Sequence, residues 1–238
     1  MKKISELSIF FPFWNEGKNI ENVISKAIPV AEAVADKWEI IMVDDGSSDN
    51  TLEVARKLEA KHLSLRLVSH QPNRGYGAAL KEGFESAKYK YIVFNDGDGQ
   101  FDFSEIDKFL EKIGDADMVI GHRKKRVDNP FRHLLMNLLK LWDLMLFGFY
   151  FRDIDCGFKL FTKEALDKIM PLTSEGAMIT TEILAKAEKA KLKIEQVEVN
   201  HYPRVFGNQS GGNLRVILRA VKESLFLWKE INFNYGRN

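Results

Sequence analysis

Short, continuous apolar runs alternate with longer segments of helical periodicity along the first half of the chain. The apolar runs, which we expect to be strands, cover residues 7–11, 39–43, 64–69, 91–95 and 118–121. Between them, apolar side chains repeat at helical spacing over residues 19–35, 50–61, 77–87 and 103–113. Strands that are apolar on both faces and separated by helices predict an α/β fold with a mostly parallel central sheet and helices on both faces.

The second half of the chain continues this pattern less regularly. Two further strands are expected at residues 156–161 and 194–201, and a helix is expected at 180–191. The largely apolar segment 131–151 is a candidate core helix or lipid-facing helix, with Lys140 and Asp143 near its middle arguing against a membrane span.

The C-terminal segment 214–233 has a basic amphipathic pattern. Arg215, Arg219 and Lys222 fall on one helical face, and apolar side chains fall on the opposite face. We therefore expect one domain over residues 1–213. The C-terminal helix, 214–238, is predicted to be part of the same domain or to contact an anionic membrane surface.

Composition narrows the possible classes of protein. The chain has 35 lysines and arginines against 34 acidic residues, a net charge of +1, which argues against a nucleic-acid-binding protein. Cys156 is the only cysteine, so a disulfide framework is excluded and a reducing, cytoplasmic compartment fits. Because the chain shows neither a secretory leader pattern nor about 18 consecutive uncharged apolar residues, no conventional membrane span is predicted.

Acidic residues follow the apolar run at 91–95. Asp96 and Asp98 stand one residue apart, between glycines and ahead of Gln100. A solvated Asp-Gly turn would explain the pair. The alternative is a site for Mg²⁺ or Mn²⁺, since ligands bind at the carboxyl ends of parallel strands and these cations prefer oxygen ligands.

A second acidic pair, Asp44 and Asp45, follows the run at 39–43. Capping the next helix needs one acid, so a carboxylate remains to accept hydrogen bonds from a nucleobase or ribose. Glu16, after the first run, could act in the same way. The glycine-rich segment 73–77 fails as a dinucleotide-binding loop because Leu80 occupies the third glycine position.

Basic residues are concentrated at 121–132, where five lysines and arginines accompany one aspartate. A solvated surface loop is one interpretation. The position of the segment, after a predicted strand and before the apolar segment, suggests instead a contact with phosphate or an anionic headgroup.

Six motifs occur in order between residues 8 and 210: PxxNE, VDDGSSDxT, NxGxG, DGDxQ, DxxCGFKLF and HxxRxxGxxS. In this, the chain resembles the family 2 glycosyltransferases, which have the A-type nucleotide-sugar fold. It is most similar to the branch that contains dolichol-phosphate mannose synthase and the polyprenyl-phosphate glycosyltransferases.

The resemblance implies roles for particular residues. Those implied for nucleotide binding are Pro12, Asn15, Glu16, Asp44, Asp45 and Asp96. Those implied for the metal are Asp96, Asp98 and Gln100. Arg204 would contact the donor diphosphate and, with Asp98, serve catalysis. The candidates for phosphate contact on the acceptor side are Arg123, Arg126, Arg132 and Ser210. The chain departs from the family at Ser210, because the usual Ser-Lys pair after the glycine is replaced by Gln-Ser-Gly-Gly.

The predicted activity is metal-dependent, inverting transfer of a sugar from a UDP- or GDP-sugar to a polyprenyl phosphate at the cytoplasmic face of a membrane. A phosphate acceptor is already an anion, so a general base is unnecessary. A saccharide hydroxyl acceptor, as in cell-envelope polysaccharide synthesis, is the alternative; it would need a base, for which Asp153, Asp155 and Glu182 are candidates. A non-catalytic nucleotide-sugar-binding module and a nucleotidyltransferase are further alternatives.

Overall fold

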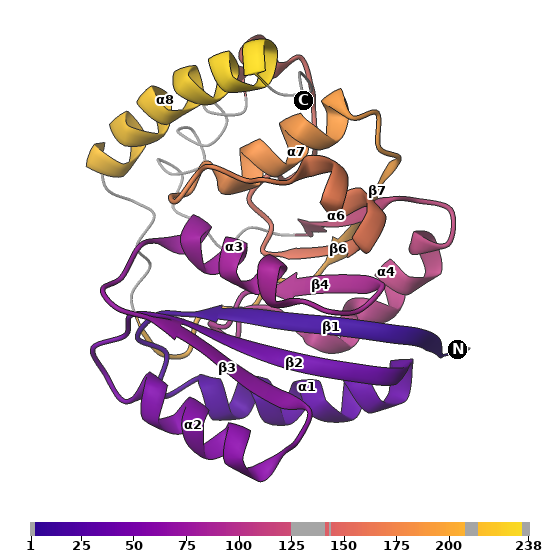
Figure 1. Ribbon diagram of the computed structural model, residues 1–238, viewed down its shortest axis with the longest axis vertical. Coiled ribbons are helices and arrows are strands. Elements are labelled where there is room, and N and C mark those ends of the chain that lie inside the picture. Colours follow the sequence, from indigo (N-terminus) through magenta and orange to yellow (C-terminus); the bar gives the residue numbers. More distant parts are fainter. Residues whose placement is uncertain (1–2, 125–140, 143, 208–213, 235–238) are drawn as a thin grey trace.

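The computed structural model describes residues 3–124, 141–142, 144–207 and 214–234. Within them the chain forms a seven-stranded sheet between two layers of helices (Figure 1). The strands are β1 (Ile4–Phe13), β2 (Ala35–Asp45), β3 (Leu65–His70), β4 (Tyr91–Asn95), β5 (Met118–Arg123), β6 (Phe158–Thr162) and β7 (Ile194–Val199).

The strand order is β3-β2-β1-β4-β6-β5-β7. β6 runs antiparallel to both of its neighbours, β4 and β5, and the other strand pairs are parallel. The predicted mostly parallel sheet is thus confirmed. Because β1 lies between β2 and β4, the chain order changes direction at β1, and ligands of such sheets bind at that point.

Helices cover both faces of the sheet, as predicted. One face carries α1 (Ile20–Val34), α2 (Thr51–Lys61), the 3₁₀ turn η1 (Phe103–Glu105) and α4 (Ile106–Ile113). The other face carries α3 (Tyr76–Ser86), α6 (Lys163–Ile169), α7 (Ile179–Lys189), α8 (Leu214–Lys229) and the π-helical turn η2 (Glu230–Asn234).

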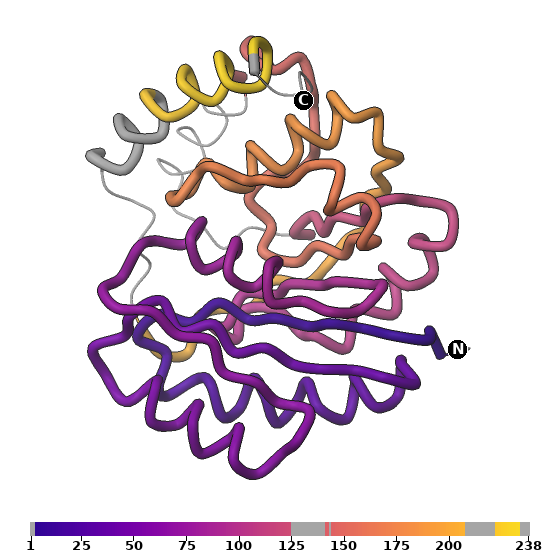
Figure 2. Tube along the Cα trace, viewed as in Figure 1, coloured from indigo at the N-terminus to yellow at the C-terminus, as the bar shows by residue number. Residues whose placement is uncertain are grey.

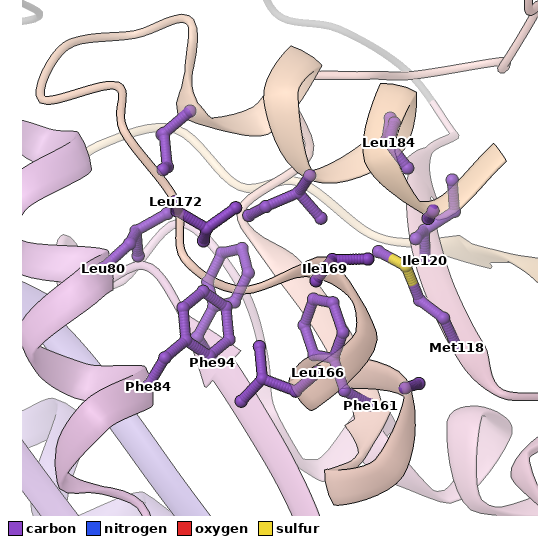
Figure 3. Close-up of a cluster of buried hydrophobic side chains, with 14 of the residues drawn as sticks. Leu80, Phe84, Phe94, Met118, Ile120, Phe161, Leu166, Ile169, Leu172 and Leu184 are labelled. Carbon is purple, nitrogen blue, oxygen red and sulfur yellow. The ribbon is translucent and has the colours of Figure 1, made fainter. Parts of the chain in front are cut away.

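The apolar runs are continuous because each strand contributes side chains to two cores. On one side Phe10 packs edge-on against Phe84 of α3, with ring centroids 5.0 Å apart. On the other side Phe11 packs against Phe103, with ring centroids 5.6 Å apart. Figure 3 shows the first core, in which Phe84, Phe94 and Phe161 gather with Leu166 and Ile169 of α6 and Leu184 of α7.

The sequence pattern located the seven strands but not all of their ends. β1 and β2 extend beyond the predicted runs at both ends: their first residues alternate in burial or carry polar side chains, and their last residues, Phe13 and Asp45, are buried. Helix α6 was not predicted; the Thr162 hydroxyl caps it by accepting a hydrogen bond from the Ala165 N–H at 3.1 Å. Of the predicted helix at 131–151, the described residues 141–142 and 144–147 are helical, and 125–140 lie outside the described residues.

The C-terminal helix packs on the same core as the sheet. Leu227 and Ile231 are buried in it, and the Trp142 indole donates a hydrogen bond to the Ser224 hydroxyl at 2.8 Å. None of the helices in the described residues is long and apolar enough to cross a membrane.

Candidate functional site

The polar residues singled out in the sequence gather at the carboxyl ends of β1, β2 and β4. The segment that follows β7 runs to the same edge, as Figure 2 shows for the light-orange chain near residue 200. There the Asn19 amide donates a hydrogen bond to the carbonyl of Phe206 at 3.4 Å. Residues from four separate stretches of sequence therefore line one site.

Asp96 and Asp98 lie directly after β4, on a backbone that is held from several sides. The Asp96 N–H donates to the Gly157 carbonyl at 2.9 Å, and the Tyr76 hydroxyl donates to Asp96 Oδ1 at 2.8 Å. A Cβ on Gly157 would lie 1.9 Å from Asp96 Oδ2, so a side chain at residue 157 would displace this carboxylate. The Gln100 N–H donates to Asp98 Oδ1 at 3.0 Å.

Both carboxylates have a pKa above the ordinary value of an aspartate. Burial, together with the charge of Asp98, raises the pKa of Asp96 to about 7. Burial also raises the pKa of Asp98 above its usual value. Two acids whose charged forms are disfavoured in the protein alone are well suited to bind a cation that neutralises them.

Arg204 joins two of the predicted site loops. Its guanidinium forms an ion pair with Glu16, after β1, and Nη1 lies 3.6 Å from Asp98 Oδ2, after β4. The same guanidinium donates from Nε to the Phe206 carbonyl at 2.7 Å. Because it lies beside a candidate metal ligand, Arg204 could also contact an anion that binds at this edge of the sheet.

Asp44 is a buried carboxylate, and neither of its oxygens accepts a hydrogen bond of good geometry from the described residues, although the hydroxyl and N–H of Ser47 lie nearby. Only 1% of the residue is exposed. Burial raises its pKa, and neighbouring Ser47 offsets this in part. A buried, unpaired carboxylate is costly, so its retention at the strand end fits a ligand that donates hydrogen bonds to it.

Asp45 has a different environment. Its oxygens accept hydrogen bonds from the Asn73 amide at 2.8 Å, the Arg74 N–H at 2.8 Å and the Gly75 N–H at 3.0 Å, and lie 2.6 Å from His70 Nε2. These contacts engage both oxygens, so that Asp45 fixes the loop that leads into α3. The contact of Asp45 with a nucleotide stays a prediction.

Asn15 and Pro12 shape the loop after β1. Asn15 has a positive φ of 56°, and its Oδ1 accepts a hydrogen bond from the Ser48 N–H at 2.8 Å. Pro12 is buried in β1, and a Cβ on Gly97 would lie 2.7 Å from its carbonyl oxygen. Both residues therefore hold together the loops that carry the acidic groups.

Gln100 connects the acidic loop to the segment that carries Arg204. Its amide nitrogen donates to the Tyr202 carbonyl at 3.0 Å, and the Tyr202 N–H donates to the Gln100 carbonyl at 2.9 Å. Among the described residues, none donates a hydrogen bond to the side-chain oxygen of Gln100.

Arg123, at the end of β5, forms a bidentate ion pair with Asp153. The Nε–Oδ2 distance is 2.6 Å and the Nη2–Oδ1 distance is 2.8 Å, and both side chains are largely buried. The pair engages two of the three guanidinium nitrogens that could have contacted an acceptor phosphate. Asp155, two residues later, is half-buried, and its charge acts on both Arg123 and Lys159.

Three further predicted phosphate contacts, Arg126, Arg132 and Ser210, lie outside the described residues. Glu182, a candidate base, is fully buried in α7; it accepts hydrogen bonds from the N–H groups of Thr173 and Ser174 and forms an ion pair with Lys186 at 2.7 Å. Through these contacts the Glu182 carboxylate holds the loop that contains Thr173 and Ser174.

Sequence reasoning missed Tyr76 and Lys159. Lys159 is fully buried in β6, donates to the carbonyls of Ile154 and Cys156, and lies 5.5 Å from the centre of the Phe94 ring. A lysine within the apolar run FKLF indicates a buried ammonium group, which needs hydrogen-bond acceptors close by. Tyr76 gave no comparable signal, because one tyrosine at a helix start is unremarkable in sequence.

The residues at this edge fit a divalent cation that takes part of its coordination from a ligand. In the described residues, no group of three or more acidic, histidine or cysteine side chains could hold a metal alone. Asp96 and Asp98 supply two carboxylates, and a hard cation completes its shell with water and phosphate oxygens.

Comparison with known proteins assigns the family. The profile described as "Glycosyl transferase family 2" matches residues 8–170. The chain belongs to glycosyl transferase family 2. The match begins in β1 and ends just after α6, so it contains both acidic pairs and the Arg123–Asp153 ion pair.

Among family 2 relatives, dolichyl-phosphate beta-glucosyltransferase of Saccharomyces cerevisiae is 32% identical over 82% of this chain and 66% of its own length. Dodecaprenyl-phosphate galacturonate synthase of Rhizobium johnstonii is 27% identical over 93% of this chain and 67% of its own length. The chain thus spans about two thirds of the length of these curated relatives, and slightly less than that of the yeast protein.

A solved structure confirms the fold. Glucosyl-3-phosphoglycerate synthase from Mycobacterium tuberculosis, in complex with Mn²⁺, uridine diphosphate and phosphoglyceric acid, aligns over 95% of this chain and 78% of its own, with a TM-score of 0.72 and 18% identity. At that identity the similarity concerns the fold alone.

Proposed function

We propose that this chain is a divalent-metal-dependent, inverting glycosyltransferase that moves a sugar from a UDP- or GDP-sugar to a polyprenyl phosphate. The observation that carries the proposal is the meeting of Asp44, Asp96, Asp98 and Arg204 at one edge of the sheet. The names of the two curated relatives, both of which include a polyprenyl phosphate, support the acceptor class.

The donor side follows from the two acidic loops. Asp44 is the group that would accept a hydrogen bond from a base N–H, because it is buried and its oxygens are unpaired within the described residues. Uracil and guanine both offer such a donor. Asp45 and Asn15 would act on the nucleotide indirectly, by holding the loops after β2 and β1.

The leaving group is a nucleoside diphosphate, whose negative charge grows as the sugar departs. Asp96, Asp98 and the side-chain oxygen of Gln100 would hold Mg²⁺ or Mn²⁺, which when bound stabilises that charge. Arg204 would leave its contact with Asp98 and donate to the diphosphate oxygens.

The acceptor side needs less from the protein. A phosphate monoester has a second pKa of about 6, so it attacks as an anion without a general base. Arg123, Arg126 and Arg132 would bind it, with Ser210 as a further contact. Asp155 would act as the base if the acceptor were a saccharide hydroxyl, which is the second candidate function.

A lipid acceptor implies contact with a membrane surface, which we propose to be the cytoplasmic face. The apolar side chains of α8 and η2 support this: Leu225, Phe226 and Phe233 are 45%, 66% and 53% exposed. Exposed aromatic side chains on a helix with basic residues suit the boundary of an anionic bilayer.

The test is a thermal-shift panel followed by a transfer assay. UDP, GDP and their glucose, mannose and galacturonate conjugates are each added with and without Mn²⁺, because a ligand that binds the folded state raises its melting temperature. We expect a metal-dependent rise with one nucleoside diphosphate, and then transfer from that donor to polyprenyl phosphate. Transfer to a saccharide but not to the lipid would select the second candidate, and no shift at saturating concentrations would overturn the proposal.

A further inference from the structure

The hydroxyl of Tyr76 is the one hydrogen-bond donor that reaches the Asp96 carboxylate in the described part of the chain. It donates to Oδ1 at 2.8 Å. The other oxygen, Oδ2, lies against the α-carbon of Gly157, where no side chain could stand. The carboxylate is therefore held between a donor on one side and the backbone on the other.

Tyr76 is the first residue of α3, and the loop at 174–175 holds this end of the helix in place. The N–H groups of Gly77 and Ala78 donate to the Glu175 carbonyl at 2.9 and 3.3 Å. A Cβ on Gly77 would lie 2.5 Å from the Ser174 carbonyl oxygen, so the start of the helix is packed against this loop.

The residues before Tyr76 are fixed from the opposite direction by Asp45. Its oxygens bind the N–H groups of Arg74 and Gly75, the two residues that precede the tyrosine. Asp45 thus sets the position of Tyr76, and the hydroxyl of Tyr76 in turn contacts Asp96.

A neutral donor suits this position better than a lysine or arginine would. A cationic donor would neutralise the carboxylate that a metal ion needs, whereas a phenol remains uncharged near neutral pH. Tyr76 can therefore fix the rotamer of Asp96 and leave its charge for the cation.

We propose that Tyr76 is a positioning residue that orients Asp96 for divalent-metal binding, and that Asp45 keeps Tyr76 in place. This inference rests on the proposed function, in which Asp96 holds the metal. Tyr76 does not touch the reacting atoms; it acts through Asp96.

The test compares Tyr76→Phe with Tyr89→Phe. Phenylalanine keeps the packed ring and removes only the hydroxyl, while Tyr89 lies before β4, at the other end of that strand. Mn²⁺ affinity is measured by electron paramagnetic resonance on the full chain, with Mn²⁺ alone and with UDP or GDP. We expect a dissociation constant about tenfold higher in Tyr76→Phe, as for the loss of a hydrogen bond to a charged group, and no change in Tyr89→Phe.

A second readout separates positioning from packing. Excess Mn²⁺ should restore the transfer rate of Tyr76→Phe, because the defect lies in metal affinity, whereas a packing defect would lower the rate at every Mn²⁺ concentration. Mn²⁺ affinity within about twofold of the wild type would overturn the inference and leave the proposed function standing. A wild-type protein that binds no Mn²⁺ with either nucleotide would overturn both.

Discussion

At the scale of single residues, neighbouring acids that look equivalent in sequence have different hydrogen-bond partners in the structure. Asp44 is buried without a partner in the described residues, whereas Asp45 is engaged by donors from the 70–75 loop. The alternation of side chains along β2 sends adjacent residues to opposite faces. Asp44 therefore faces the candidate nucleobase site, and Asp45 faces the loop before α3.

Replacing Asp98 by alanine should remove metal-dependent transfer and leave the fold intact. In the proposed site Asp98 would contribute a carboxylate to the cation, and it lies beside Arg204, so we expect a rate loss of about hundredfold or more. Transfer assays and melting curves check this. Asp115→Ala, an exposed acid beyond the end of α4, is the matched control and should keep full activity. Full activity in Asp98→Ala would refute the metal assignment.

The acidic pair also makes stability depend on pH in a defined direction. Because the folded protein raises the pKa of Asp96 from 3.8 to about 7, it binds the proton more tightly than the unfolded chain does. This contribution is fully present below about pH 4 and is lost as pH rises toward 7. The melting temperature of the metal-free wild type should fall over this range relative to Asp96→Asn. Parallel curves for the two proteins would contradict the prediction.

At the scale of elements, the antiparallel strand β6 supports the site from behind. The loop before it supplies Asp153 to Arg123, and β6 itself supplies Lys159, whose ammonium group holds the carbonyls of Ile154 and Cys156. The buried charges thus brace the loop that packs against Asp96 through Gly157.

Asp153→Asn should destabilise the protein strongly, because it leaves the largely buried Arg123 guanidinium without its anionic partner. We expect a loss of about 3 kcal/mol in the free energy of unfolding, measured by urea denaturation. The matched control is Asp167→Asn, which breaks the exposed ion pair with Lys163. That change should cost less than about 1 kcal/mol. Equal effects would mean that the Arg123 pair contributes no more than a surface pair.

At the scale of the whole molecule, the sheet edge with the candidate site and the C-terminal helix belong to one packed unit. α8 contributes Leu227 to the same core as the buried side chains of α7, and two of its other apolar side chains, Leu225 and Phe226, remain exposed. The proposed function, transfer from a water-soluble donor to a lipid acceptor, would place the donor site in water and this exposed surface at the bilayer.

Phe226→Asp should weaken binding to vesicles that contain anionic phospholipid. Removing one inserted aromatic side chain should lower the partition coefficient about tenfold in a co-sedimentation assay. Leu63→Asp, at a fully exposed apolar residue between α2 and β3, is the matched control and should bind like the wild type. Unchanged binding by Phe226→Asp would remove α8 from the proposed membrane surface.

The sequence by itself determined the α/β class, the seven strands and the family, because apolar periodicity and motif order are local properties. It also placed Asp44, Asp96 and Asp98 at strand ends, since the residues after a buried strand reach the edge of the sheet. Only the tertiary structure decided that Arg204 meets Asp98, that Asp45 serves a loop and that Tyr76 serves Asp96. These contacts join residues 20 to 106 positions apart, and their partners depend on strand order and helix placement, which no local pattern encodes.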